Sequence, residues 1–445
     1  MQEILHFVLQ QTIDRSGFTV PEITEKLGRE RSWLYRLLNR SRPVRIEHAE
    51  EIYAALGHPI AQYFVACLNR LNSPHVAAKS DLASNPSVLL RILRGESNPD
   101  LGWLEQFRSR RVSQPDGSAS YRLHPKVRRI DDAREFNRQA ALVDVERWLR
   151  SFERRCRRRR ITMQETSQLA TALGVWASIQ RVNGHQALGL KALELAWELH
   201  GDNPWIASTG DLLERSSTAV YKYGYPLLGV PLMQRAHGIV SMLGDPDGEA
   251  KTMLGLGILA FRTGNGEGAR SAFEQVLEHP GADSFRRVAA GNYLAMAFEA
   301  SGALEQARSH LNELASYLPD LPIAAQLPIR AVEARVLQHL GDLEGALAIH
   351  EDVFAKAQQH YSPLNRAVAL LHLVETQMQL GRVGMLSSYS GHLAVLIGEL
   401  EETPLSREIL KSLLLRIRTD QKLAAEEIVR MREEIAGELL GAGES

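Results

Sequence analysis

A short stretch near the N-terminus, residues 31–42, carries side chains whose types suit contact with DNA. Arginine makes a bidentate hydrogen bond to guanine, and asparagine and hydroxyl side chains bind base edges or phosphates. We assign Arg31 and Arg36 to bases, and Arg40, Arg42 and Arg45 to phosphates that set the register on the duplex. The alternative is a solvated helix face without a ligand. The candidate DNA-contacting residues are Thr19, Arg31, Ser32, Trp33, Tyr35, Arg36, Asn39, Arg40 and Arg42.

Amphipathic helices must position this stretch. Apolar residues recur at spacings of three and four in residues 2–15, 20–27, 30–39 and 46–56, which is the pattern of helices with one buried face. Thr19 is a good N-cap, and Pro21 suits a first helical turn. Gly28 ends that helix, because glycine takes the positive φ of a tight turn. The pattern predicts two helices joined by a turn, with residues 30–39 as the second.

Residues 20–39 resemble the Cro/repressor (XRE-like) helix-turn-helix. The apolar positions and the turn glycine fall where that family keeps them, at Ile23, Leu27, Gly28, Leu34 and Leu37. The resemblance implies an N-terminal DNA-binding domain over residues 1–70, whose recognition helix places its first residues over base edges in the major groove. Several positions depart from the family. A Val20-Pro21 pair replaces a common Gln, and Leu38 and Arg40 stand where Glu and Gly usually follow the recognition helix. Thr24 replaces its usual small alanine, and Arg29 replaces its usual buried aliphatic residue.

The charge distribution favours an anionic partner for the N-terminal part only. The net charge is −1, but residues 1–160 hold 29 Lys and Arg against 19 Asp and Glu. Residues 161–445 hold 23 Lys and Arg against 34 Asp and Glu. This asymmetry favours a nucleic acid beside the basic third of the chain. The alternative is ordinary variation in charge between helical surfaces.

The segment that follows is predicted to connect two domains. Residues 71–130 hold many Pro, Gly, Asn and Ser, and we predict a partly flexible linker with short helices at 87–94 and 101–111. Residues 131–165 are predicted as a connecting helix that begins at Asp131, with Asp132 and Glu135 as a capping box. Six arginines lie between Arg154 and Arg160. They could bind phosphates, dock on the acidic part of the chain, or stand exposed.

A glycine recurs at intervals of 38 to 40 residues through residues 166–403. In the best-matched repeats, Gly257 and Ala295 precede it by seven residues, and Ala269 and Ala307 follow it by five. Self-similarity at such a period predicts a solenoid of about six helical hairpins. Each hairpin has an apolar face that it can bury only against its neighbours. The recurring glycines are Gly184, Gly224, Gly264, Gly302, Gly341 and Gly381.

This pattern resembles the tetratricopeptide repeat (TPR), whose small residues lie where paired helices cross closely. The resemblance implies a right-handed superhelix whose first helices line a concave groove. Arg262, Arg335 and Lys222 could hold a carboxylate there, and Asn292 could bind an extended peptide backbone. The alternative is a solvated groove. By register the groove residues are Tyr221, Lys222, Phe261, Arg262, Asn292, Met296, Glu299, Arg335, His339, Leu371 and Glu375.

Residues 404–445 hold apolar residues at helical spacing, which predicts helices that cap the solenoid or form a dimer contact. The all-α arrangement as a whole resembles the peptide-pheromone receptors that join an XRE-like helix-turn-helix to a TPR array (the RRNPP type). That resemblance implies a homodimeric transcriptional regulator of quorum sensing. A peptide or protein effector in the array would control its binding to double-stranded DNA.

Two other function classes stay open. The chain could be an interaction scaffold, whose N-terminal domain contacts proteins instead of DNA. An enzyme is not expected, because no glycine-rich phosphate loop, His-Glu-x-x-His motif or nucleophile elbow occurs. With only Cys67 and Cys156, neither a disulfide framework nor a metal site is expected, and we expect no cofactor. The absence of a long apolar run predicts no membrane span, and we expect a cytoplasmic protein.

Overall fold

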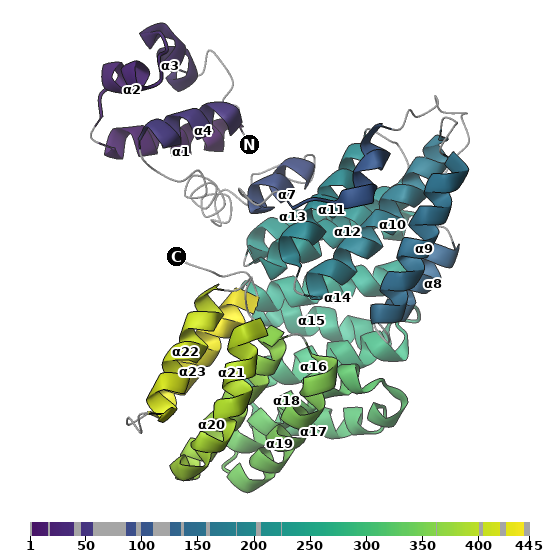
Figure 1. Cartoon of the computed structure of the whole chain (residues 1–445). Coiled ribbons are helices and arrows are strands. Elements are labelled where there is room, and N and C mark those ends of the chain that lie inside the picture. Colours follow the sequence, from purple (N-terminus) through teal and green to yellow (C-terminus); the bar gives the residue numbers. More distant parts are fainter. Residues whose placement is uncertain are drawn as a thin grey trace.

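The computed structural model is all-α (Figure 1). Helices account for nearly all its regular structure, and the residues that it describes contain no β-strand. Figure 1 shows a small group of N-terminal helices and a long stack of helical hairpins. The structure describes residues 2–16, 18–39, 46–56, 86–94, 99–109, 125–134, 138–156, 161–183, 185–201, 206–223, 225–361, 363–399, 404–418 and 424–439.

The N-terminal group follows the predicted helices closely. The Thr19 hydroxyl accepts a hydrogen bond from the backbone N–H of Glu22, whose carboxylate accepts one from the N–H of Thr19, so a capping box begins the second helix. Gly28 ends it with a φ of 60°. Apolar side chains from all the helices form the core. The helices are α1 (Gln2–Arg15), α2 (Val20–Lys26), α3 (Arg31–Leu38) and α4 (Ile46–Ala55).

The short helices predicted at 87–94 and 101–111 are present as α7 (Pro86–Arg94) and the 3₁₀ helix η2 (Gly102–Ser109), but the next helix begins elsewhere than predicted. The expectation of a helix starting at Asp131 is wrong, because Asp131 lies inside α8 (Pro125–Arg134). Pro125 suits a first helical position, and Val127 and Ile130 are buried, so the apolar face already begins before Asp131. The next helix is α9 (Arg138–Cys156).

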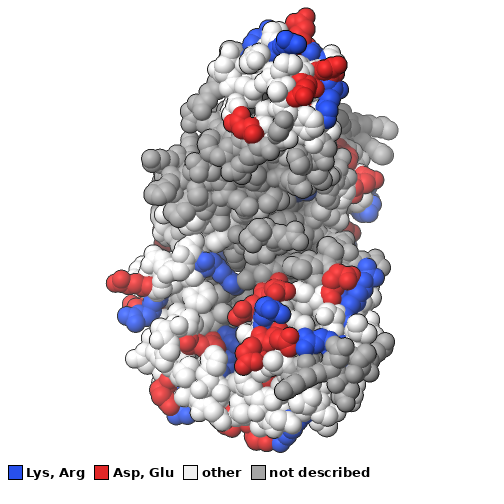
Figure 2. All heavy atoms as spheres, turned by 90° about the vertical axis from the view of Figure 1, so that its left-hand side faces the viewer, with Lys and Arg blue, Asp and Glu red and all other residues white. Residues whose placement is uncertain are grey.

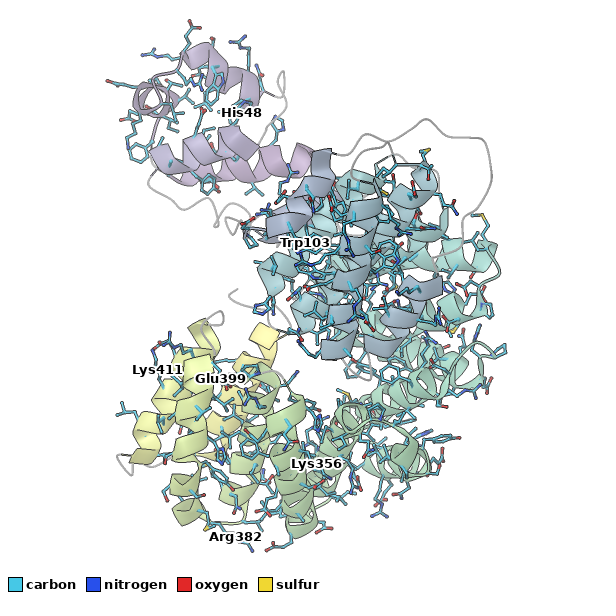
Figure 3. All side chains as sticks on the ribbon, turned by 45° about the vertical axis from the view of Figure 1, so that its right-hand side comes forward. His48, Trp103, Lys356, Arg382, Glu399 and Lys411 are labelled. Carbon is cyan, nitrogen blue, oxygen red and sulfur yellow. The ribbon has the colours of Figure 1, made fainter. Side chains whose placement is uncertain are left out.

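The described parts of residues 86–109 pack on the solenoid. The buried carboxylate of Glu194 on α11 (Gln186–His200) accepts hydrogen bonds from Arg91 and Arg94 of α7 (Pro86–Arg94). Trp103, labelled in Figure 3, belongs to the 3₁₀ helix η2 (Gly102–Ser109). The guanidinium carbon of Arg150 lies 4.3 Å from the centre of its ring. These described residues are therefore held to the array by packing and ion pairs.

Successive antiparallel hairpins make up the described residues between 163 and 399. The first helices of the hairpins are α10 (Met163–Val182), α12 (Ile206–Lys222), α14 (Pro246–Arg262), α16 (Ser284–Ala300), α18 (Ile323–His339) and α20 (Pro363–Gln379). The second helices are α11 (Gln186–His200), α13 (Pro226–Met242), α15 (Gly266–Glu278), α17 (Leu304–Ala315), α19 (Leu343–His360) and α21 (Ser390–Glu399), with short 3₁₀ helices η3 (Leu318–Asp320) and η4 (Val383–Tyr389). This is a TPR-like solenoid.

The repeat register identified in the sequence matches this stacking. Gly264, Gly302, Gly341 and Gly381 end the first helices with φ between 72° and 89°, a conformation that side chains with a Cβ disfavour. Gly184 and Gly224 lie outside the described residues. The small residues before and after the glycines are buried where the paired helices cross. Five first helices are 17 residues long, which is one reason for the long period.

The C-terminal helices cover the last hairpin. Leu410 and Leu413 of α22 (Pro404–Arg418) and Ile428 and Ile435 of α23 (Ala425–Leu439) are buried in one core with α20 and α21. Figure 1 shows α22 and α23 beside α20 and α21 at the end of the stack. The structure thus supports the capping role for these helices, and their role in dimer formation stays a prediction.

Candidate functional site

The exposed face of α3 holds most of the predicted DNA-contacting residues. Arg31, Ser32, Tyr35, Arg36 and Asn39 are exposed, whereas the leucines of the same helix are buried or half-buried. The Arg36 side chain folds along the helix, and its Nε donates to the backbone oxygen of Ser32 at 3.1 Å. The helix α3 therefore has an exposed polar face opposite a buried apolar face.

Trp33 corrects one expectation, because it lies in the core and not on the exposed face. Its side chain is 7% exposed and meets His48 of α4 edge to face, with 5.6 Å between the ring centres. Of the departures from the XRE-like pattern, Arg29 contacts Trp33 directly. Arg29 turns outward, pairs with Glu51 at 3.0 Å and covers the Trp33 ring, while the buried Thr24 hydroxyl donates to the backbone oxygen of Val20.

The other basic candidates contribute less to this face. Thr19 uses its side chain in the helix cap, and Arg40 and Arg42 lie outside the described residues. Arg154 and Arg155 are exposed at the end of α9, and the rest of that arginine run lies outside the described residues. Figure 2 shows Lys and Arg interspersed with Asp and Glu over the N-terminal helices at its top.

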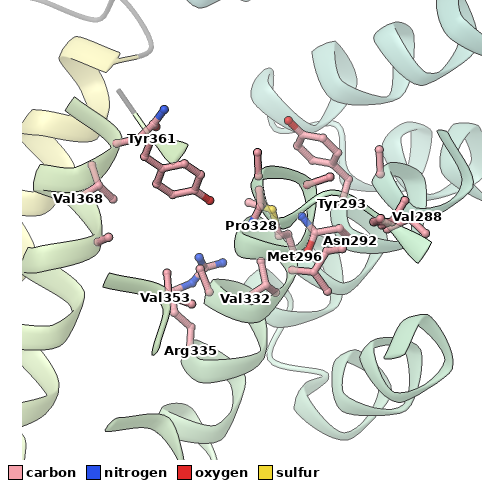
Figure 4. A pocket seen from close by; sticks show the side chains of 18 of the residues that line it. Val288, Asn292, Tyr293, Met296, Pro328, Val332, Arg335, Val353, Tyr361 and Val368 are labelled. Atoms are coloured by element: carbon pink, nitrogen blue, oxygen red, sulfur yellow. The ribbon is translucent and has the colours of Figure 1, made fainter. Parts of the chain in front are cut away.

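A cavity of about 390 Å³ opens between α16, α18 and α20. Its walls are mainly apolar, with Val288, Met296, Val332 and Val368 among them. Figure 4 shows Tyr361 and Val368 on one side of the cavity and Asn292 and Tyr293 on the other. A volume of this size fits a small molecule or the end of a short chain.

The structure brings some of the predicted groove residues to this cavity. Arg262, Asn292, Met296 and Arg335 line it. Glu299 forms two hydrogen bonds to Arg335, at 3.0 and 2.6 Å, and lies 3.5 Å from His339, so these three form one ion-pair group.

Other predicted groove residues lie away from the cavity. Tyr221 and Leu371 are buried in the core. Lys222 and Phe261 are half-buried. The Glu375 carboxylate is buried and binds Arg432 of α23 and the amide of Gln338. The helical register placed these residues on first helices, but it could not show which neighbouring helices cover each side chain.

The cavity also contains residues that the sequence analysis did not single out. Tyr293, Pro328, Tyr361 and His372 line it. Tyr293 lies next to Asn292 in sequence and close to the guanidinium of Arg262. The neighbouring position in the repeat register was the only signal that could have found it, since nothing in the sequence pairs residue 293 with residue 361.

A buried histidine pair adjoins the cavity. The rings of His350 and His372 stack with 5.3 Å between centres and 6° between planes. Burial, together with the nearby guanidinium groups of Arg335 and Arg432, lowers the pKa of His350 to about 4. The same causes, burial first, lower the pKa of His372 well below its usual value. Both rings are therefore neutral in the folded protein at pH 7.

Acidification should destabilise the array through this pair. A histidine with a folded pKa of about 4 and an unfolded pKa near 6.5 is protonated first in the unfolded chain. Stability is thus lost as the pH falls below about 6.5, and His350 alone accounts for about 2–3 kcal/mol by pH 4.5. Urea unfolding of the native chain and of His350→Asn at pH 7 and pH 4.5 measures this. The variant should lose less stability between the two pH values, and an equal loss would contradict the assignment.

Comparison with known proteins gives limited further information. No protein-family model matches the sequence, and no curated protein matches it. Among solved structures, two crystal structures from Podosopora anserina, titled "putative kinesin light chain nearly identical TPR-like repeats", are similar to part of the chain. They are 19% and 20% identical, cover 43% and 44% of this chain and 95% and 99% of their own, and have TM-scores of 0.35 and 0.34. The fold stated above therefore rests on the helices of this chain itself.

The described residues contain neither a candidate membrane span nor a candidate metal site. No helix there is both long and apolar enough to cross a membrane. No group of three or more His, Cys, Asp or Glu side chains there is placed to hold a metal ion. Cys156 is 1% exposed, so its thiol is shielded from solvent in the folded chain.

Proposed function

We propose that this chain is a DNA-binding transcriptional regulator whose helical array binds a peptide or protein effector. The observation that carries the proposal is the face of α3. Arg31, Tyr35 and Arg36 stand exposed there on a helix whose other face is fixed in a core. A helix held in this way after a tight turn suits insertion into the major groove. The excess of basic residues in the first 160 residues supports an anionic partner.

In this proposal, the helical array controls the binding of the chain to DNA. The cavity between α16, α18 and α20 is the place where an effector would bind. In a homodimer, an effector that changes the curvature of the solenoid would change the separation of the two α3 helices. Half-sites on DNA lie about 34 Å apart, so a small change in that separation alters affinity. Sedimentation would test this mechanism, since a monomer that binds DNA with unchanged affinity excludes it.

Loss of the two α3 arginines should abolish selective DNA binding. Each bidentate contact contributes about 1–3 kcal/mol of discrimination, so Arg31→Ala/Arg36→Ala should weaken binding to a selected site by about 100-fold or more. The site is first selected from random duplexes with the full chain, and affinity is then measured by fluorescence anisotropy across a salt series. Arg308→Ala, an exposed arginine on α17 paired with Glu305, is the control and should bind normally.

Two results would count against the regulator. Equal, steeply salt-dependent binding to selected and scrambled DNA would mean only a basic surface. The absence of any DNA binding, with the cavity still occupied by a ligand, would favour an interaction scaffold. One observation favours that second candidate. The apolar cavity lies in the array, and its walls include no residue of α1–α4.

A further inference from the structure

Two arginines line the cavity. An acid neutralises one of them, and the other has no acid partner among the described residues. At one end, Glu299 neutralises Arg335 through two hydrogen bonds. At the other end, Arg262 reaches the cavity from the last turn of α14. Among the described residues, Arg262 forms no ion pair with Asp or Glu, and its buried Nε has no hydrogen-bond partner. Its guanidinium lies close enough to Tyr293, another wall of the cavity, to act on the pKa of that phenol.

Further cations reinforce the Arg262 end. Lys222 ends α12, and Arg181 lies in the last turn of α10. Three successive first helices therefore each carry a cation in their C-terminal turn. Burial and the two arginines lower the pKa of Lys222, which indicates that these groups repel one another. Among the described residues, Lys222 forms no ion pair with an acid, and its ammonium lies 5.3 Å from the centre of the Tyr221 ring.

Helix ends explain only part of this cluster. Each helix C-terminus carries about half a negative charge, which stabilises a cation in its last turn. That charge does not satisfy a buried guanidinium N–H, which costs free energy when it has no acceptor. An anion bound at Arg262 would supply the acceptor and relieve the repulsion at once.

Asn292 limits the kind of anion. Its side chain is 8% exposed, and its buried Oδ1 has no donor partner. Because Asn292 and Arg262 line the same cavity, one ligand can give Oδ1 an N–H and Arg262 an acidic oxygen. The remaining walls are mainly apolar, and their polar side chains are Tyr293, Arg335, Tyr361, Asn365 and His372. A fatty acid has the carboxylate and the apolar body but no N–H, whereas the last residues of an apolar peptide have all three.

We propose that this cavity binds the free C-terminus of a short apolar peptide, with the terminal carboxylate at Arg262 and a backbone N–H at Asn292. The proposal rests on the proposed function and deepens it. It specifies that the effector is apolar and that the array binds its C-terminal end. The Arg335 end then contacts the more N-terminal part of the ligand. Lys222 and Arg181 act through the charge at Arg262 and do not need to touch the peptide.

The experiment uses the full chain and two matched libraries of N-acetylated tripeptides, one with free C-terminal carboxylates and one with C-terminal amides. Bound peptides are identified by affinity selection and mass spectrometry, and affinities of the best sequences are measured by calorimetry. We expect enrichment of apolar sequences from the acid library only. Arg262→Gln should weaken the best acid by about 10- to 100-fold, because a charge-assisted hydrogen bond is lost.

Matched variants separate this result from damage to the fold. Arg330→Gln on α18 removes an exposed arginine that pairs with Glu333 and does not line the cavity, so it should bind as the native chain does. Lys222→Gln leaves the cavity walls unchanged and should weaken binding less than Arg262→Gln. Asn292→Leu should weaken peptides while leaving decanoate, a carboxylate without an N–H, unaffected.

Each other outcome overturns the proposal. Equal enrichment from both libraries, or none from the acid library, excludes recognition of a C-terminal carboxylate. Binding of decanoate that depends on Arg262, without any enriched peptide, would identify a fatty acid site instead. No DNA is present in these measurements. A failure of the regulator proposal would therefore appear only in the DNA titration, and a failure of the ligand proposal only here.

Discussion

Arg215→Met should destabilise the chain by about 3–5 kcal/mol, because it leaves two acids without their buried counter-ion. The Arg215 side chain is 2% exposed. Its guanidinium binds the carboxylate of Asp211 at 2.8 and 2.9 Å and that of Asp131 at 2.6 and 3.2 Å. The charges of Asp131 and Asp211, together with these bonds, outweigh burial and raise the pKa of Arg215. The arginine thus joins α12 to α8 across the first hairpin.

Thermal and urea unfolding of the full chain would measure this loss. The deficit of the variant should shrink as the pH falls toward 4, since protonation removes the negative charges that Arg215 compensates in the native chain. Adding Asp211→Asn should restore part of the stability for the same reason. Arg270→Met is the control, because Arg270 and its partner Glu274 are 54% and 55% exposed and should contribute at most about 0.5 kcal/mol. A loss no larger than that of the control would contradict the buried network.

Gly257→Ala should destabilise the third hairpin through a clash with Phe273. A Cβ on Gly257 would lie 2.6 Å from Cε1 of the Phe273 ring, which is fully buried. Overpacking of this kind costs about 1–3 kcal/mol, and Phe273→Ala alone costs about 3–5 kcal/mol. In the double variant the clash is gone, so its loss should be smaller than the sum of the two single losses by about 1 kcal/mol or more.

A double-mutant cycle by urea unfolding measures this coupling. Gly266→Ala supplies the control, because a Cβ there meets no atom within 4 Å, and its effect should add to that of Phe273→Ala. Additivity for Gly257 as well would mean that the helices of this hairpin do not cross as described. Phe273 stacks on Tyr293 with 5.5 Å between ring centres, so Phe273→Ala should also weaken ligand binding in the cavity.

The sequence by itself determined the local structure and the repeat. Apolar spacing and caps predicted α2 and α3 to within a residue or two, and Gly28 and Gly302 take the positive φ expected of turn residues. Small residues such as Gly257 marked the close helix crossings, because those contacts recur with the repeat. These features depend on neighbours along the chain or at a fixed period, and both are visible in one dimension.

The tertiary structure alone decided which side chains meet. Glu375, a predicted groove residue, instead forms an ion pair with Arg432, 57 residues away. Asp131, a predicted helix start, forms an ion pair with the buried Arg215, 84 residues away. Arg262 remained at the cavity without an acid partner among the described residues. Helical periodicity gives the direction of a side chain from its own axis, but burial and charge compensation depend on what the other helices bring to that face. The candidate site exists only because packing leaves some cations paired and others not.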